Sequence, residues 1–290
     1  MVSTKLTTSI VKEFIPPRSQ NSHKGDNGKI LILGGSYIYH GAPILASLAA
    51  LRCGTDLVYT AVPKINSQAT RAASPNLIVI PLADQKLTRG ATRKLLGQIP
   101  IGIDSAAIGM GLAIQERGAL ILLIKTLVNS DVRLLLDASA LVPEILPEVS
   151  GKNCALCPHA GEYERIFGRR VPNNFDDRVC EVEKMALKYN VVIALKGKTD
   201  IISDGRKTYH NLTNTPSMTV GGTGDVLSGI TAGMLAKNRN IIQAVSAATF
   251  VNGLAGTRVQ KQLGLHILAT DVCDAIPYVM QPFDRIGDDK

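Results

Sequence analysis

The sequence contains no tryptophan, and aromatic residues make up only 4% of its 290 residues. It also lacks uninterrupted apolar runs of about 18 residues, the length that a membrane-spanning helix needs. The segment from Met1 to Pro17 does not show the basic and then apolar pattern of a secretory signal. We therefore predict a globular cytoplasmic protein with no membrane partner.

Cysteine is scarce as well: there are five, an odd number, scattered along the chain. This argues against a disulfide framework and fits a reducing compartment. The spacing Cys154-x-x-Cys157-x-His159 matches part of a zinc site, but no second Cys/His pair at a usable spacing completes four ligands. We therefore predict no metal site formed by these side chains.

Positive charge is in excess, with a formal net charge of +8. The basic residues are dispersed, however, and no recognition-helix or RNA-binding signature accompanies them. A basic pocket for small anions and a solvated basic surface both explain the surplus. We therefore predict no nucleic-acid partner.

Short apolar runs alternate with amphipathic segments along the chain. We expect strands at residues 29–33, 56–61, 77–81, 106–110, 133–137, 155–158 and 191–196, a hairpin over 200–203 and 207–211, and helices at 43–50, 118–129, 177–189, 225–236 and 241–262. This pattern is typical of an α/β fold with a mostly parallel sheet covered by helices on both faces. We expect a single domain over residues 1–290, with residues 1–17 and 284–290 frayed.

The most informative segment runs from Asn214 to Ile230. The sequence Gly221-Gly222-Thr223-Gly224 lets the backbone turn sharply and direct several N–H groups at one point, and a predicted helix follows. Asp225, in the first turn, is placed to take a proton from a substrate hydroxyl while the loop stabilises a phosphoryl group. We expect the helix dipole to lower its basicity. The alternative is an ordinary loop with Asp225 as a helix cap.

Other candidate ligand residues follow predicted strands, where such folds bind ligands. Lys196-Gly197-Lys198-Thr199-Asp200 combines a cation, a glycine and a carboxylate, and suits either a nucleotide or a solvated turn. Gly109-Met110-Gly111 permits close backbone approach, but Ile114 breaks the dinucleotide-binding pattern. A lone His159 is more often structural than catalytic, although the neighbouring glycine favours ligand contact.

Taken together, these segments resemble the ADP/ATP-dependent NAD(P)H-hydrate dehydratases, a branch of the ribokinase-like superfamily. The resemblance runs nearly end to end. It rests on residues 23–28, Gly34-Gly35-Ser36, Gly41-Ala42-Pro43, residues 49–54, residues 136–141, Pro158-His159-Ala160-Gly161-Glu162, Lys196-Gly197 and residues 218–229.

The resemblance implies repair of hydrated NADH or NADPH, the S epimer, at the expense of a nucleoside phosphate. The hydrate would contact Ala42, Gly109, Gly111, His159 and the catalytic Asp225. The nucleotide would contact Lys196, Gly197, Lys198, Thr199, Asp200 and Gly224, while Gly222, Thr223 and Gly224 would form the anion hole for the transferring phosphoryl group. Mg²⁺ would offset charge on ADP or ATP, and the resemblance to single-domain members favours ADP.

The chain departs from the family pattern at four positions. Thr215 and Ser217 replace glycines, which stiffens the loop without removing donors, and Met110 replaces a proline. Ser139 replaces an aspartate, which bears on Mg²⁺ or water near the phosphates. The family often carries an amino-terminal epimerase domain, for which the region before Gly28 is too short, so we expect an epimerase acting in trans. The resemblance also implies a homotetramer.

Two other functions use the same residues. A ribokinase-like kinase of a small alcohol, such as a vitamin precursor, would employ the same loop and Asp225. A non-catalytic nucleotide sensor would bind ADP without turnover. Net dehydration of a hydrated dinucleotide separates the first interpretation from both alternatives.

Overall fold

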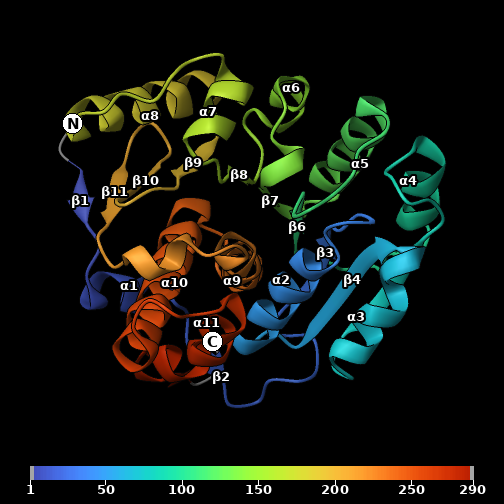
Figure 1. Cartoon of the computed structure of the whole chain (residues 1–290), viewed down its shortest axis with the longest axis horizontal. Coiled ribbons are helices and arrows are strands. Elements are labelled where there is room, and N and C mark those ends of the chain that lie inside the picture. Colours follow the sequence, from blue (N-terminus) through green and yellow to red (C-terminus); the bar gives the residue numbers. More distant parts are fainter. Residues whose placement is uncertain (1–2, 288–290) are drawn as a thin grey trace.

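The computed structural model describes residues 3–287, which build a ten-stranded sheet in the order β1-β11-β10-β9-β8-β7-β6-β3-β4-β5 (Figure 1). The strands are β1 (Thr4–Lys5), β3 (Lys29–Leu33), β4 (Leu57–Pro63), β5 (Ile78–Leu82), β6 (Ser105–Ile108), β7 (Arg133–Leu136), β8 (Cys154–Leu156), β9 (Val192–Leu195), β10 (Asp200–Ser203) and β11 (Thr208–Asn211). Pairing is parallel from β5 to β9, and β10 runs antiparallel to both of its neighbours. The expected mostly parallel sheet with a hairpin is confirmed.

Helices cover both faces of this sheet. On one face lie α1 (Thr8–Phe14), α2 (Gly41–Arg52), α9 (Thr223–Lys237), α10 (Ile241–Leu263) and α11 (Ala269–Met280); on the other lie α4 (Arg89–Leu96), α5 (Arg117–Asn129), α6 (Leu146–Val149), α7 (Ala160–Phe167) and α8 (Phe175–Tyr189). In β3, Ile30 and Ile32 enter one core while Leu31 and Leu33 enter the other. Burial on both faces explains why the strand is apolar throughout.

The chain ends differ from expectation. Val11 and Phe14 of α1 are buried, and β1 pairs with β11, so the described part of the amino-terminal segment is packed rather than frayed. Near the other end, β12 (Ile286–Gly287) pairs with β2 (Arg18–Ser19). Residues 1–2 and 288–290, also expected to fray, lie outside the described residues.

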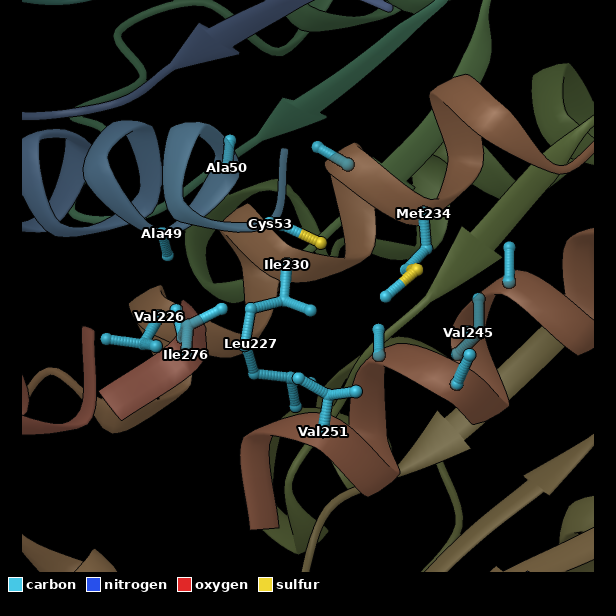
Figure 2. Close-up of a cluster of buried hydrophobic side chains, with 14 of the residues drawn as sticks. Ala49, Ala50, Cys53, Val226, Leu227, Ile230, Met234, Val245, Val251 and Ile276 are labelled. Atoms are coloured by element: carbon cyan, nitrogen blue, oxygen red, sulfur yellow. The ribbon is translucent and has the colours of Figure 1, made fainter. Parts of the chain in front are cut away.

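The centre of one face is formed by α9, which is apolar around most of its circumference because other helices enclose it. Figure 2 shows Val226 and Ile230 of α9 among side chains of α2, α10 and α11. The packing is closest at Gly229, where an added Cβ would lie 1.9 Å from the carbonyl oxygen of Ala46 on α2. The amino-terminus of α9 is therefore held by a rigid core.

Between residues 3 and 287, no helix is long and apolar enough to cross a membrane. All five cysteines are free, and Cys180 on α8 is exposed while the others are buried.

Candidate functional site

The turn into α9 depends on glycine. Gly222 caps the helix with a φ of 100°, and an added Cβ would lie 2.8 Å from the side chains of both Leu45 and Ala269. Gly221 and Gly224 instead face open space. The first N–H groups of a helix have no partner within it, so these groups and the helix dipole make the turn suitable for an anion.

Thr223 shapes this turn through its side chain. Its hydroxyl donates to the carbonyl oxygens of Met218 and Val220, at 2.8 and 3.2 Å. The hydroxyl is thus committed to the preceding loop, and what Thr223 can offer an anion is its backbone N–H. The structure places Gly222, Thr223 and Gly224, the three residues of the predicted anion hole, together at the start of α9.

Two cavities flank the start of α9. The hairpin-side cavity, of about 560 Å³, is lined by His159, Lys196, Gly197, Lys198, Asp200, Asn214, Thr215, Pro216, Met218, Thr219, Thr223, Gly224, Leu227 and Asn252. The α2-side cavity, of about 670 Å³, is lined by Ser36, Ile38, Tyr39, His40, Gly41, Ala42, Leu45, Gly111, Leu112, Ala113, Ala138, Ser139, Gly221, Gly222 and Asp225. Gly224 lines the first and Asp225 the second. An anion bound at the turn would therefore have the carboxylate of Asp225 on its other side.

The hairpin-side cavity brings together the predicted nucleotide residues Lys196, Gly197, Lys198, Asp200 and Gly224, whereas Thr199 does not line it. Asp200 fixes the loop: one carboxylate oxygen accepts from the N–H of Gly197 at 3.0 Å and the other from the Asn214 amide at 2.6 Å. The Asn214 amide also donates to the Gly197 carbonyl at 2.9 Å. Burial raises the pKa of Asp200, although these donors oppose the shift.

Lys196 is an ion-pair partner inside the protein. Its Nζ lies 2.6 Å from Oδ1 of Asp137 and 3.5 Å from Oε2 of Glu162. Burial disfavours the ammonium, but the negative charge of Asp137 and Glu162 outweighs burial and raises the pKa of Lys196. The other oxygen of Asp137 accepts from the Ser228 hydroxyl at 2.7 Å. Lys196 therefore stays charged and still faces the cavity, so it remains available to a phosphate.

Asp225 is more basic than its sequence position predicts. Burial and the nearby charge of Asp137 raise its pKa from 3.8 to about 6, while Lys196 opposes the rise. The expectation that the helix dipole lowers its basicity is therefore wrong, because desolvation and a like charge outweigh the dipole. A carboxylate with this pKa is deprotonated at neutral pH and is suited to general-base catalysis.

His159 lies with the nucleotide residues and away from the α2-side cavity. Its Nδ1 accepts from the N–H groups of Gly161 and Glu162 at 3.0 and 3.3 Å, and the Glu162 carboxylate accepts from the His159 N–H at 2.8 Å. This reciprocal capping starts α7. His159 therefore has the structural role that is common for a lone histidine, and its contact with a hydrate stays a prediction.

The remaining predicted substrate residues divide into two groups. Ala42 and Gly111 line the α2-side cavity together with Asp225. Gly109 does not line it: its φ is 125°, and an added Cβ would lie 1.9 Å from the carbonyl oxygen of Asp137. Gly109 therefore allows two strand-end loops to touch. Ser139, at a departure from the family pattern, also lines this cavity.

Sequence reasoning missed several residues of the site. Asn214 holds the loop before β10 through Asp200, and Ser228 donates to Asp137; both lie in the marked segment 214–230, but neither was singled out. Asn252 lines the hairpin-side cavity and lies outside every marked segment. Only the pairing of distant strands and helices reveals them.

Mg²⁺ is the ion that the resemblance implies. Within residues 3–287 no group of three or more His, Cys, Asp or Glu side chains is arranged to hold a metal ion. Asp137, the nearest acidic residue to Ser139 in sequence, already accepts from Lys196, Ser228 and the N–H of Ala138. The site therefore fits an ion carried by nucleotide phosphates and does not fit a protein-built metal cage.

Comparisons with known proteins show what the chain is similar to. The family model described as NAD(P)H-hydrate dehydratase matches residues 30–278. An ADP-dependent (S)-NAD(P)H-hydrate dehydratase of Cenarchaeum symbiosum is 61% identical over 276 residues, which cover 95% of this chain and 96% of that protein.

The fold is also similar to those of solved structures. The ADP/ATP-dependent NAD(P)H-hydrate dehydratase of Bacillus subtilis, co-crystallised with ATP/Mg²⁺, superposes with a TM-score of 0.84 at 27% identity. The match covers 98% of this chain and 100% of that one. A ribokinase-like superfamily protein of Enterococcus faecalis has a TM-score of 0.78 at 23% identity, with coverage of 98% and 97%. The latter supports the expected ribokinase-like fold alone.

Proposed function

Because this chain belongs to the NAD(P)H-hydrate dehydratase family, we propose that it converts the S epimer of hydrated NADH or NADPH to the reduced dinucleotide, with ADP as phosphoryl donor. The observation that carries the proposal is the shared turn at the start of α9, with Gly224 in one cavity and Asp225 in the other. A transferring phosphoryl group at this turn lies between a donor site and a base.

The nucleotide occupies the hairpin-side cavity. Its phosphates point at the N–H groups of the turn and at Lys196, whose retained positive charge attracts them. The hydrated nicotinamide ring occupies the α2-side cavity, where Ala42 and Gly111 allow close approach and Asp225 faces the ring hydroxyl. The expected contacts of the hydrate with Gly109 and His159 are also proposed: Gly109 acts by shaping the loop, and His159 contacts the part of the hydrate that extends past the turn to the hairpin-side cavity.

The reaction proceeds in two stages. Asp225 removes the proton of the ring hydroxyl as that oxygen bonds to the terminal phosphorus of ADP, and the bond to AMP breaks. The turn stabilises charge on the transferring group. The ring nitrogen then donates its electron pair, the carbon–oxygen bond breaks and phosphate leaves. Loss of a proton from the neighbouring ring carbon restores the reduced nicotinamide.

Mg²⁺ supplies charge neutralisation on the nucleotide phosphates when it is bound. The protein's own contribution is to orient the phosphates with Lys196 and the turn, and to hold the proton acceptor. Ser139 lines the α2-side cavity at the position where the family pattern has an aspartate, so it offers a hydroxyl where a carboxylate would bind an ion.

Three broader proposals accompany this function. The carbon that bears the hydroxyl is a stereocentre, and the relative from Cenarchaeum symbiosum is named for the S form, so an NAD(P)H-hydrate epimerase acting in trans would supply that form. The exposed apolar side chains Leu263, Leu265 and Leu268 are suited to contacts between copies in the expected homotetramer. The cytoplasm, where the reduced dinucleotides are used, is the proposed location.

The test follows absorbance in the reduced-nicotinamide band with purified protein, Mg²⁺ and hydrated NADPH, after addition of ADP or ATP. A rise with ADP supports the proposal, and a rise with ATP alone would change the donor. No rise with either, from folded protein that binds nucleotide, would favour the small-alcohol kinase if another alcohol is phosphorylated. Tight ADP binding without any turnover would favour the sensor.

A further inference from the structure

Asn252 on α10 lines the hairpin-side cavity and carries a buried polar atom that has no partner. Its side chain is only 5% exposed, and its Oδ1 is buried without a hydrogen-bond partner. An unpaired buried oxygen of this kind destabilises the folded state, so such atoms are rare in folded proteins. A ligand that donates a hydrogen bond to Oδ1 would remove this cost.

Its location distinguishes the Asn252 oxygen from the other buried polar atoms that have no hydrogen-bond partner. Among residues 3–287, the buried side-chain atoms without a partner are Thr55 Oγ1, Arg133 Nε, Ser246 Oγ and Asn252 Oδ1. Only Asn252 lines either of the two cavities at the start of α9. The other three residues do not line these cavities, so Asn252 is the one whose amide a bound ligand can reach, by rotation of the side chain toward the cavity.

The surroundings of Asn252 suit a flat apolar group. Leu227 and Met218 line the same cavity. Close packing of α10 against the 213–219 loop defines this wall, since a Cβ added to Gly256 would lie 2.2 Å from the Met218 sulfur and one added to Gly253 would lie 1.9 Å from Thr213 Oγ1. The apolar side chains of this otherwise polar cavity, together with the amide of Asn252, suit a planar ring that has polar groups along one edge.

We propose that Asn252 recognises the adenine base of the nucleotide, with Oδ1 accepting from the 6-amino group and Nδ2 donating to N7. This inference rests on the proposed function, because it takes the hairpin-side cavity as the nucleotide site. An amide presents one donor and one acceptor, which match the amino group and N7 of adenine. Hypoxanthine and guanine carry an acceptor at position 6, so the amide cannot pair with both of their groups.

The test compares ADP with inosine diphosphate, which keeps the ribose and both phosphates and changes the base at position 6. Affinities of wild type, Asn252→Leu and Ser246→Ala are measured by calorimetry. We expect wild type to prefer ADP, and Asn252→Leu to lose roughly tenfold to a hundredfold in ADP affinity with little change for inosine diphosphate. Ser246→Ala, which removes an unpaired oxygen elsewhere on α10, leaves both affinities unchanged.

A second measurement separates recognition from a structural role. Without nucleotide, Asn252→Leu melts at or above the wild-type temperature because it removes an unsatisfied atom, whereas a side chain needed for folding would lower it. Asn252→Ala replaces the leucine variant if leucine does not fit. Equal losses for both nucleotides, or no preference in wild type, would overturn the inference and point to a ribose or phosphate contact.

The proposed function is judged by a separate assay. If wild type repairs the hydrate with ADP but Asn252→Leu keeps the full preference for ADP over inosine diphosphate, only the role of Asn252 is refuted. If wild type prefers ADP over inosine diphosphate as expected but does not repair the hydrate, only the proposed function is refuted.

Discussion

The two cavities at the start of α9 are bounded in different ways. The hairpin-side cavity has walls tied by polar contacts: Asn214 bonds to Asp200, and Ser217 donates to Gln260 at 2.9 Å. The α2-side cavity is bordered by Ile38 and Tyr39, whose exposed fractions are 73% and 63%. The difference indicates that the nucleotide meets fixed polar groups, whereas the hydrate meets apolar area and the reactive carboxylate.

Removing the carboxylate of the α2-side cavity gives the largest expected effect. Asp225→Asn keeps the shape but cannot accept the hydroxyl proton, so kcat falls by about 10²–10⁴-fold. ADP affinity changes little, because Asp225 lines the other cavity. Turnover and ADP binding are measured on the same preparation. Wild-type turnover in this variant would remove Asp225 from its role as base.

The next effect comes from breaking the polar wall of the hairpin-side cavity. Lys196→Met leaves Asp137 and Glu162 buried without their cation, which we expect to lower the free energy of unfolding by about 3–5 kcal/mol and to weaken ADP binding. Chemical denaturation and calorimetry measure the two quantities. Lys198→Met, at an exposed position in the same loop, is the matched control and should leave stability unchanged.

The carboxylate of the α2-side cavity should make both activity and stability depend on pH. Since the pKa of Asp225 is about 6, kcat should fall about tenfold per unit as the pH drops below that value. The raised pKa means that the folded protein binds this proton more tightly than the unfolded chain does. Stability due to Asp225 is therefore present below pH 3.8 and is lost as the pH rises to about 6.

Asp225→Asn should remove that dependence and be more stable than wild type at pH 7, by roughly 1–3 kcal/mol. Unfolding curves of both proteins at pH 4 and pH 7 measure the difference. A kcat that stays constant from pH 7 to pH 5 would contradict the assigned base.

A smaller effect is expected in the 214–219 loop, where Thr215 and Ser217 depart from the family pattern. It tests whether the hydroxyl contacts of these two residues hold the loop in place. Ser217→Gly loses the bond to Gln260 and the contact with Thr215, which lowers stability by about 0.5–1.5 kcal/mol and weakens ADP binding slightly. Thermal melts with and without ADP measure both. Gln260→Ala should reproduce the change, and an intact melt in both variants would mean that the loop is positioned by packing alone.

The smallest effect belongs to the open border of the α2-side cavity. Tyr39→Ser removes an exposed ring, so we expect a KM for the hydrate that is a few fold higher, with ADP affinity and stability unchanged. Steady-state kinetics with each substrate varied in turn measure this. A change confined to ADP would reverse the assignment of the two cavities.

Much of the sheet was predictable because its strands are buried on both faces and read as continuous apolar runs, as in Lys29–Leu33. Helix α1 was missed because its burial depends on packing against the distant α10. The glycine turn and Asp225 were predictable from local sequence. The raised pKa of Asp225 was not, because it arises first from burial and then from the charge of Asp137, which is 88 positions earlier (225 minus 137), and both causes exist only in the folded protein.

The contact of Gly229 with the Ala46 carbonyl has a consequence for how the reactants meet. Helix α2 carries the hydrate-side residue Ala42 near its start, and α9 carries the turn that receives the phosphoryl group. With no space between them, the two helices form one frame, and neither can slide or tilt without the other. The distance between the sites for phosphoryl donor and acceptor is then fixed when the chain folds. Binding therefore only has to bring each reactant into a cavity that is already in position.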